Sequence, residues 1–120
     1  MIPLSDEVLA KLRTEHPRGI SNYGLTDGSA WVFRKPTADE WRACKGDLAV
    51  AVVQDDPARI ATAHERLAHA CCVYPSADAF QALRDEDPGI AGNFGERLFS
   101  SFGSGRSIVE GKAESSPAKP

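Results

Sequence analysis

The stretch Pro36-Thr37-Ala38-Asp39-Glu40-Trp41 recurs in a second form as Pro75-Ser76-Ala77-Asp78-Ala79-Phe80. Both copies share the pattern Pro-[Ser/Thr]-Ala-Asp-x-aromatic, and both follow an apolar run. In each copy a hydroxyl can accept from a backbone N–H in the first turn of a helix, and an aspartate then lies near the positive end of the helix dipole. The phrase therefore predicts two helix starts, each anchored by its closing aromatic residue.

The two copies differ in the element that we expect before them. A hairpin strand is expected before Pro36, whereas a helix is expected to run up to Pro75. The apolar stripe of that helix comprises Ile60, His64, Leu67, Cys71 and Tyr74. We therefore interpret the likeness as convergence on one helix-start chemistry and not as an internal repeat.

Similar signals predict the other helices. Ser5 is suited to cap a first helix, and Asp56-Pro57 and Asp87-Pro88 each place a capping residue before a proline at the first helical position. Thr37 and Glu40 match a capping box. The helix that begins there is expected to bury one face, while Gly46 and its β-branched valines weaken its second half. The residues of that face are Trp41, Cys44, Leu48 and Val52.

The segment between the first two helices predicts a β-hairpin over about residues 20–34. Asp27-Gly28 lies between two β-prone runs, and this dipeptide favours a tight turn because the turn needs positive φ. An isolated hairpin is marginally stable in water, so we expect it to pack on the helices.

These elements predict a mainly α fold, a small helical domain of four to five helices with one N-terminal hairpin. The domain is expected to span residues 1–103, and residues 104–120, rich in Gly, Ser, Lys and Pro, are expected to form a disordered, flexible tail. The predicted core comprises Leu9, Leu12, Trp31, Phe33, Trp41, Leu48, Ile60, Leu67, Tyr74, Phe80, Leu83, Phe94 and Leu98.

Composition argues against two classes of partner. The chain has 120 residues and a formal net charge of −3, so its bulk charge favours neither nucleic acid nor an anionic membrane. Its longest apolar run, residues 48–53, is far shorter than the roughly 20 residues of a membrane span. The N-terminus lacks the pattern of a secretory signal. Three cysteines, an odd number, fit a reducing compartment.

No constellation of residues predicts catalysis, a cofactor or a metal. His64, His69, Cys71 and Cys72 lie close in sequence, but they lack the paired spacing of a structural zinc site. We expect the cysteines to pack as small apolar residues. No serine lies in a nucleophile elbow, and no Gly-rich loop links a strand to a helix as a phosphate site requires. The expected function is therefore not enzymatic.

Residues 31–41, ending in Phe33-Arg34-Lys35-Pro36-Thr37 and Glu40-Trp41, resemble a stretch of the small tail assembly chaperones of long-tailed, siphovirus-like bacteriophages and prophages. Cys72-Val73-Tyr74-Pro75-Ser76 and Pro88-Gly89 are similar to later segments of that family. The resemblance spans about residues 4–102 and includes the order of helix, hairpin and further helices.

The resemblance implies a binding role in the cytoplasm of a bacterial host. Proteins of this family bind the long helical tape measure protein and keep it soluble until the tail tube polymerises, which implies the tape measure as partner and tail tube or tail tip proteins as further partners. Many members also have a longer, frameshifted form. Two alternatives stay open: a structural or adaptor protein of the phage tail, and a small nucleic-acid-binding regulator that uses the basic residues around the hairpin exit.

The resemblance and the clustering of aromatic residues suggest one partner-binding surface. Trp31, Phe33 and Trp41 are the candidates to flank it, with Arg34 and Lys35 as charges at its rim. The alternative is that all three aromatic side chains belong to the core, because a small domain needs its large apolar residues inside.

Overall fold

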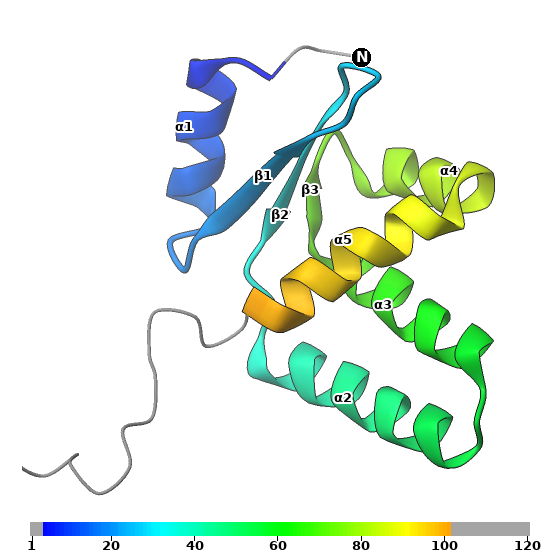
Figure 1. The fold of residues 1–120 in the computed structure, drawn as a ribbon. Helices are drawn as coiled ribbons and strands as arrows, with labels where there is room; N and C mark the ends of the chain where they lie inside the picture. Colours follow the sequence, from blue (N-terminus) through cyan, green and yellow to red (C-terminus); the bar gives the residue numbers. More distant parts are fainter. Residues whose placement is uncertain (1–3, 102–120) are drawn as a thin grey trace, which may run out of the picture.

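The computed structural model of the chain describes residues 4–101, which form five helices and a three-stranded antiparallel sheet (Figure 1). The elements in chain order are α1 (Asp6–Glu15), β1 (Ile20–Gly24), β2 (Ala30–Arg34), α2 (Ala38–Val53), α3 (Pro57–Cys71), β3 (Cys72–Tyr74), α4 (Ala77–Glu86) and α5 (Pro88–Ser101). The prediction of a mainly helical fold with an N-terminal hairpin is confirmed. The predicted tail and the boundary at residue 103 lie outside the described residues.

The predicted helix starts are confirmed by hydrogen bonds within the first turns. Ser5 and Ser76 each accept from the backbone N–H three residues on, at 3.2 and 3.0 Å. Thr37 and Glu40 form the complete capping box, with reciprocal bonds of 3.1 and 2.9 Å. Asp56 caps α3 through the N–H of Arg59 at 3.1 Å. Each bond satisfies a donor that the helix itself leaves unpaired.

The hairpin has the predicted position. β1 pairs antiparallel with β2 from Ile20 opposite Arg34 to Gly24 opposite Ala30. Gly28 has φ of +89° in the turn, a conformation that glycine adopts without strain. The Asp27 carboxylate accepts from the N–H of Ser29 at 2.8 Å, and this bond together with the Ser29 hydroxyl lowers the pKa of Asp27.

The expectation that a helix runs up to Tyr74 is wrong. α3 ends at Cys71, and Cys72–Tyr74 forms β3, which pairs antiparallel with β2. Two causes act together. Proline disfavours helical geometry in the residue before it, here Tyr74. The free edge of β2 also offers hydrogen bonds to an extended segment, which makes β2 the central strand of the sheet.

The repeated phrase consequently has the same setting in both places, which corrects the sequence-based distinction between its flanks. Pro36 follows β2 and Pro75 follows β3, so both copies connect a strand of one sheet to a helix. The two strands are neighbours in that sheet.

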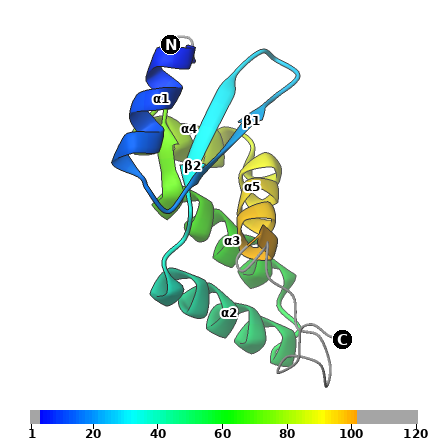
Figure 2. The same cartoon turned by 90° about the vertical axis from the view of Figure 1, so that its left-hand side faces the viewer.

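In Figure 1 the sheet lies between α1 on one face and α4 and α5 on the other. α2 lies past the end of the sheet and packs along α3 (Figure 2). Trp31 and Phe33 of β2 enter the larger core with Phe80 and Phe94, whereas Val32 between them enters a smaller core beneath α1. This alternation follows from the period of two in side-chain direction along a strand.

Most of the predicted core is confirmed. Eight of its members are buried: Leu12, Trp31, Phe33, Leu67, Tyr74, Phe80, Phe94 and Leu98. The other five are half-buried: Leu9, Trp41, Leu48, Ile60 and Leu83. Phe33 contacts Phe94 with a ring-centroid distance of 4.9 Å and meets Phe80 edge-on at 5.7 Å. These ring contacts unite the sheet with α4 and α5.

One predicted helix face differs from the observed face. Val52 was expected on the buried side of α2, but its exposed fraction is 68%. The buried residues of α2 are Cys44 and Ala51, because Ala51 lies directly in line with Cys44 after two helical turns. Among the described residues, no helix is long and apolar enough to cross a membrane.

Candidate functional site

Two of the predicted partner-binding residues lie in the core. Trp31 and Phe33 are 5% and 0% exposed. Trp31 donates its indole N–H to the Ser29 hydroxyl at 3.0 Å, and its ring meets Phe80 edge-on at 5.9 Å. The structure therefore favours the core alternative for these two side chains. The cause is the packing of α4 and α5 on this face of the sheet, where Phe80 and Phe94 cover both side chains.

Trp41 is half-buried and joins the beginning of α2 to the end of α5. Its ring stacks on Phe99 with a centroid distance of 5.1 Å and an interplanar angle of 8°. Its indole N–H donates to the carbonyl of Phe99 at 3.2 Å. The ammonium group of Lys45 lies 4.9 Å from the centre of the Trp41 ring on the solvent side. Trp41 is thus a half-buried packing residue.

The Arg34 side chain is 26% exposed and forms hydrogen bonds with two other elements of the fold, instead of lying free at the rim of a binding surface. Its guanidinium forms two hydrogen bonds with the Glu40 carboxylate, at 2.8 and 2.7 Å, and one with the carbonyl of Ala70 at 2.8 Å. It thereby links β2, α2 and the last turn of α3. The paired guanidinium lowers the pKa of Glu40 to about 2, and the Glu40 carboxylate in turn raises the pKa of Arg34.

Lys35 is exposed, and its backbone N–H donates to the carbonyl of Gly19 at 3.1 Å. A nearby hollow of about 220 Å³ lies between the end of α1 and the joint from β2 to α2. Arg18 closes part of it by donating to the carbonyl of Pro36 at 3.1 Å. The five predicted residues therefore do not converge on one surface.

A groove lies between α2 and α3. It consists of two adjoining hollows of about 340 and 240 Å³, which share Asp47, Ala63 and Arg66. We call it the α2–α3 groove. Its apolar lining comprises Ala43, Cys44, Ala58, Ala63, Leu67 and Ala70. The small alanine side chains leave room for another chain to approach closely.

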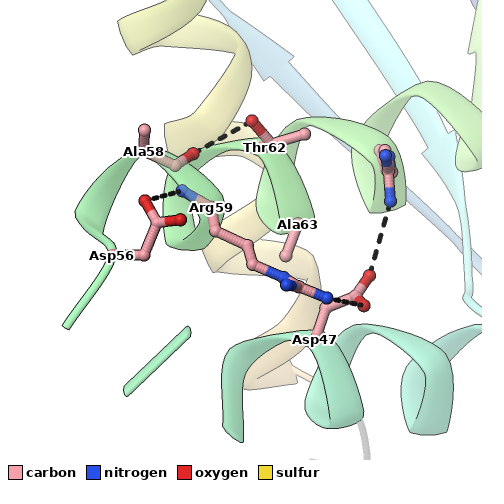
Figure 3. A pocket seen from close by; sticks show the side chains of 7 residues that line it. Asp47, Asp56, Ala58, Arg59, Thr62 and Ala63 are labelled. Carbon is pink, nitrogen blue, oxygen red and sulfur yellow. Dashed lines mark hydrogen bonds and ion pairs between the residues drawn. The ribbon is translucent and has the colours of Figure 1, made fainter. Parts of the chain in front are cut away.

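The rim of the groove carries opposite charges (Figure 3). Asp47 of α2 points toward Arg59 of α3, with 3.9 Å between the charged atoms, and lies 3.6 Å from Arg66. The side chains of Arg59 and Arg66 are 42% and 67% exposed. Asp47 thus faces two guanidinium groups across the groove, and because Asp56 and Glu40 also line it, the groove carries charges of both signs.

Sequence reasoning missed the groove because it depends on how two helices pack. One signal was present: Arg59 and Arg66 are seven residues apart, so they lie on one side of α3, and Ala63 and Ala70 continue the same stripe. That pattern describes a small-residue stripe edged by cations. It could not identify Asp47 as the opposing residue.

The cysteines and histidines take part in packing. Burial raises the pKa of Cys44, Cys71 and Cys72 to about 11, 12 and 11, so the thiols are protonated at neutral pH. His64 lies edge-on to Phe99 at 6.2 Å, and His69 stacks on Phe80 at 5.9 Å. Within residues 4–101, no three Cys, His, Asp or Glu side chains form a group that could hold a metal.

Comparisons with known proteins support the fold and no particular function. Protein-family models and curated proteins give no match to this chain. The chain is similar to the solved structure of an uncharacterised protein from Bacillus stearothermophilus. The two share 17% sequence identity with a TM-score of 0.63, and the likeness covers 84% of this chain and 97% of the other.

Proposed function

We propose that this protein is a tail assembly chaperone of a long-tailed bacteriophage or prophage, which binds helical segments of the tape measure protein in the α2–α3 groove and keeps that protein soluble during assembly. The sequence resemblance is the starting point. The segments that carry it, residues 31–41 and 72–76, include the adjacent strands β2 and β3 and the two helix starts that follow them. They therefore form one structural unit.

The observation that carries the binding role is the lining of the groove. Helices commonly bind partner helices in a shallow apolar groove, with apolar residues of the client at helical spacing. The exposed alanines Ala43, Ala58 and Ala70 let a client backbone approach closely, while the buried Cys44, Ala63 and Leu67 form the floor of the groove. The groove follows the α2–α3 seam, as a helical client requires.

The two partly exposed arginines of the groove, Arg59 and Arg66, suit a client with acidic side chains beside its apolar stripe. The contacts of Asp47 with Arg59 and Arg66 are long, at 3.9 and 3.6 Å, and partly exposed. Ion pairs of this kind contribute about 0–1 kcal/mol. Carboxylates of a client can therefore replace Asp47 as the partner of the two arginines with little loss of stability.

Co-expression with the tape measure protein of the same phage genome tests this function. We expect the wild-type chain to increase the soluble fraction of the tape measure and to co-purify with it. Ala43→Glu should abolish both effects, because Ala43 is exposed and the new carboxylate would fill the groove. Ala82→Glu on α4 is the matched control, since Ala82 is also exposed and lies outside the groove lining.

Two outcomes would contradict the proposal. If the tape measure stays as insoluble as it is without the chain, the chaperone role is wrong. If the chain is abundant in purified virions, the alternative of a permanent tail component is favoured, because a chaperone leaves before the particle is complete. Retention of nucleic acid that weakens steeply with salt would favour the regulator instead.

A further inference from the structure

The side of α2 that faces away from α3 carries a second stripe of residues. Arg42, Gly46, Ala49 and Val53 follow one another at spacings of four, three and four, and all four are exposed. We call them the outer stripe. This spacing is that of the seam between two packed helices. Val53 is 86% exposed, and Val50 beside the stripe is 39% exposed.

Gly46 lies in this stripe, and no described residue outside its own helix packs against it. It lies inside a helix of 16 residues, where glycine is less favourable than alanine. A Cβ at position 46 would meet nothing within 4 Å. At Gly95 of α5, in contrast, a Cβ would collide with the backbone of His64. Gly95 is therefore required by internal packing, whereas a contact from outside would account for Gly46.

We propose that the outer stripe binds the outer stripe of a second copy of this chain, with the two α2 helices antiparallel about a two-fold axis between Ala49 and Val50. This axis places Val53 of each copy opposite Gly46 of the other, so the exposed valine side chain meets a residue without a side chain. A two-fold contact needs such a self-complementary surface.

Charge complementarity selects a second copy as the occupant. Arg42 and Lys45 are exposed cations at one end of the stripe, where Arg42 also pairs with Asp39, and Asp55 is an exposed carboxylate just past the other end. In the antiparallel arrangement, the basic end of each α2 lies beside the acidic turn after α2 of the second copy. Both ends of the contact thus bring opposite charges together.

The contact leaves the α2–α3 groove open. The outer stripe lies on the side of α2 opposite Cys44 and Ala51, which pack on α3, and shares no residue with the groove lining. A dimer would therefore present two client grooves. This inference is independent of the client, and it stands even if the proposed function fails.

Analytical ultracentrifugation of the full chain over a range of concentrations tests the association. We expect a reversible dimer, and we expect Val53→Lys to raise its dissociation constant about a hundredfold, because two valines leave the interface and each buried valine contributes about tenfold. Val52→Lys is the matched control: Val52 is 68% exposed but lies off the stripe, so the dissociation constant should stay unchanged. A wild-type chain that stays monomeric at submillimolar concentration would overturn the proposal.

Disulfide trapping tests the register. A Gly46→Cys chain mixed with a Val53→Cys chain should cross-link under mild oxidation, while each variant alone should not, because equivalent positions 53 lie about 10 Å apart along the antiparallel helices. Self-cross-linking of Val53→Cys would overturn the antiparallel register. The three native cysteines are buried, so the wild-type chain provides the background.

The alternative to a second copy is that the tape measure protein binds the outer stripe. If the wild-type chain is monomeric and Val53→Lys abolishes co-purification of the tape measure, the stripe belongs to the client and the dimer proposal is wrong. If Val53→Lys dissociates the dimer while Ala43→Glu alone disrupts tape measure binding, the two surfaces are separate, as we propose.

Discussion

Gly95 of α5 lies directly against the backbone carbonyl group of His64 in α3, in the space that any larger residue at position 95 would need. The two helices approach this closely because Ala91 and Gly92 continue the small-residue surface of α5. A backbone carbonyl within a helix cannot swing aside as a flexible side chain can. The contact therefore makes glycine a packing requirement at position 95.

The first prediction compares the two helix-interior glycines. Gly95→Ala should lower the free energy of unfolding by at least about 1–3 kcal/mol, the usual range for overpacking. Gly46→Ala should raise the free energy of unfolding by about 0.5–1 kcal/mol, because alanine favours the helix and the site is open. Urea denaturation at a concentration where the chain is monomeric measures both. Equal effects of the two substitutions would contradict the packing argument.

The second prediction concerns Arg34 and Glu40 as a function of pH. Glu40→Gln should destabilise the protein by about 1–2 kcal/mol at neutral pH, because a charge-assisted pair is lost. The pKa of Glu40 is lowered from 4.5 to about 2 in the folded state. The stabilisation is therefore complete above pH 4.5 and disappears as the pH falls toward 2.

The measurement is the difference in stability between wild type and Glu40→Gln, from denaturation curves at a series of pH values. Asp39→Asn is the control, since the Asp39 side chain is 97% exposed and its ion pair with Arg42 should contribute little. A difference that stays constant through the acid range would show that Glu40 acts without its charge.

The third prediction concerns the thiols. Cys44, Cys71 and Cys72 are at most 8% exposed, and burial raises the pKa of each to about 11 or above. At pH 8 a thiol reagent should therefore modify the native protein far more slowly than the urea-unfolded protein, in which all three cysteines should react. Rapid stoichiometric labelling of one cysteine in the native state would contradict its placement in the core.

The fourth prediction concerns Tyr74. Its hydroxyl is buried in the smaller core without a hydrogen-bond partner among the described residues, while its ring packs with Leu12 and Val32. Tyr74→Phe should leave stability unchanged or raise it by about 1 kcal/mol, because an unpaired buried hydroxyl is costly. Tyr74→Ala should destabilise by about 3–5 kcal/mol, since the ring is lost. Thermal and urea unfolding measure both, and a large loss with phenylalanine would reveal a hidden partner.

The helix starts were predictable because each depends on bonds within three residues. Ser5, Thr37, Asp56 and Ser76 cap their helices through the nearby N–H groups that the sequence alone suggests. The hairpin was predictable for a similar reason, since Gly28 supplies the positive φ of a local turn. Helical spacing also identified Phe94 and Leu98 of α5 as core residues.

The third strand and the groove were not predictable, because neither depends on neighbours in sequence. Cys72–Tyr74 is extended because β2, about forty residues earlier, offers an open edge for hydrogen bonds. Phe80 of α4 and Phe94 of α5 cover Trp31 and Phe33, for which the sequence left both the core and a binding surface open. Asp47 faces Arg59 and Arg66 only because α2 folds back along α3.

The sequence by itself thus determined where the helices begin, where the hairpin turns and which large side chains avoid water, since capping bonds, turn geometry and helical periodicity are local. Tertiary structure alone decided which faces those elements present. The angle between two packed helices and the pairing of distant strands follow from competition among many contacts. The α2–α3 groove and the outer stripe are the result of that competition.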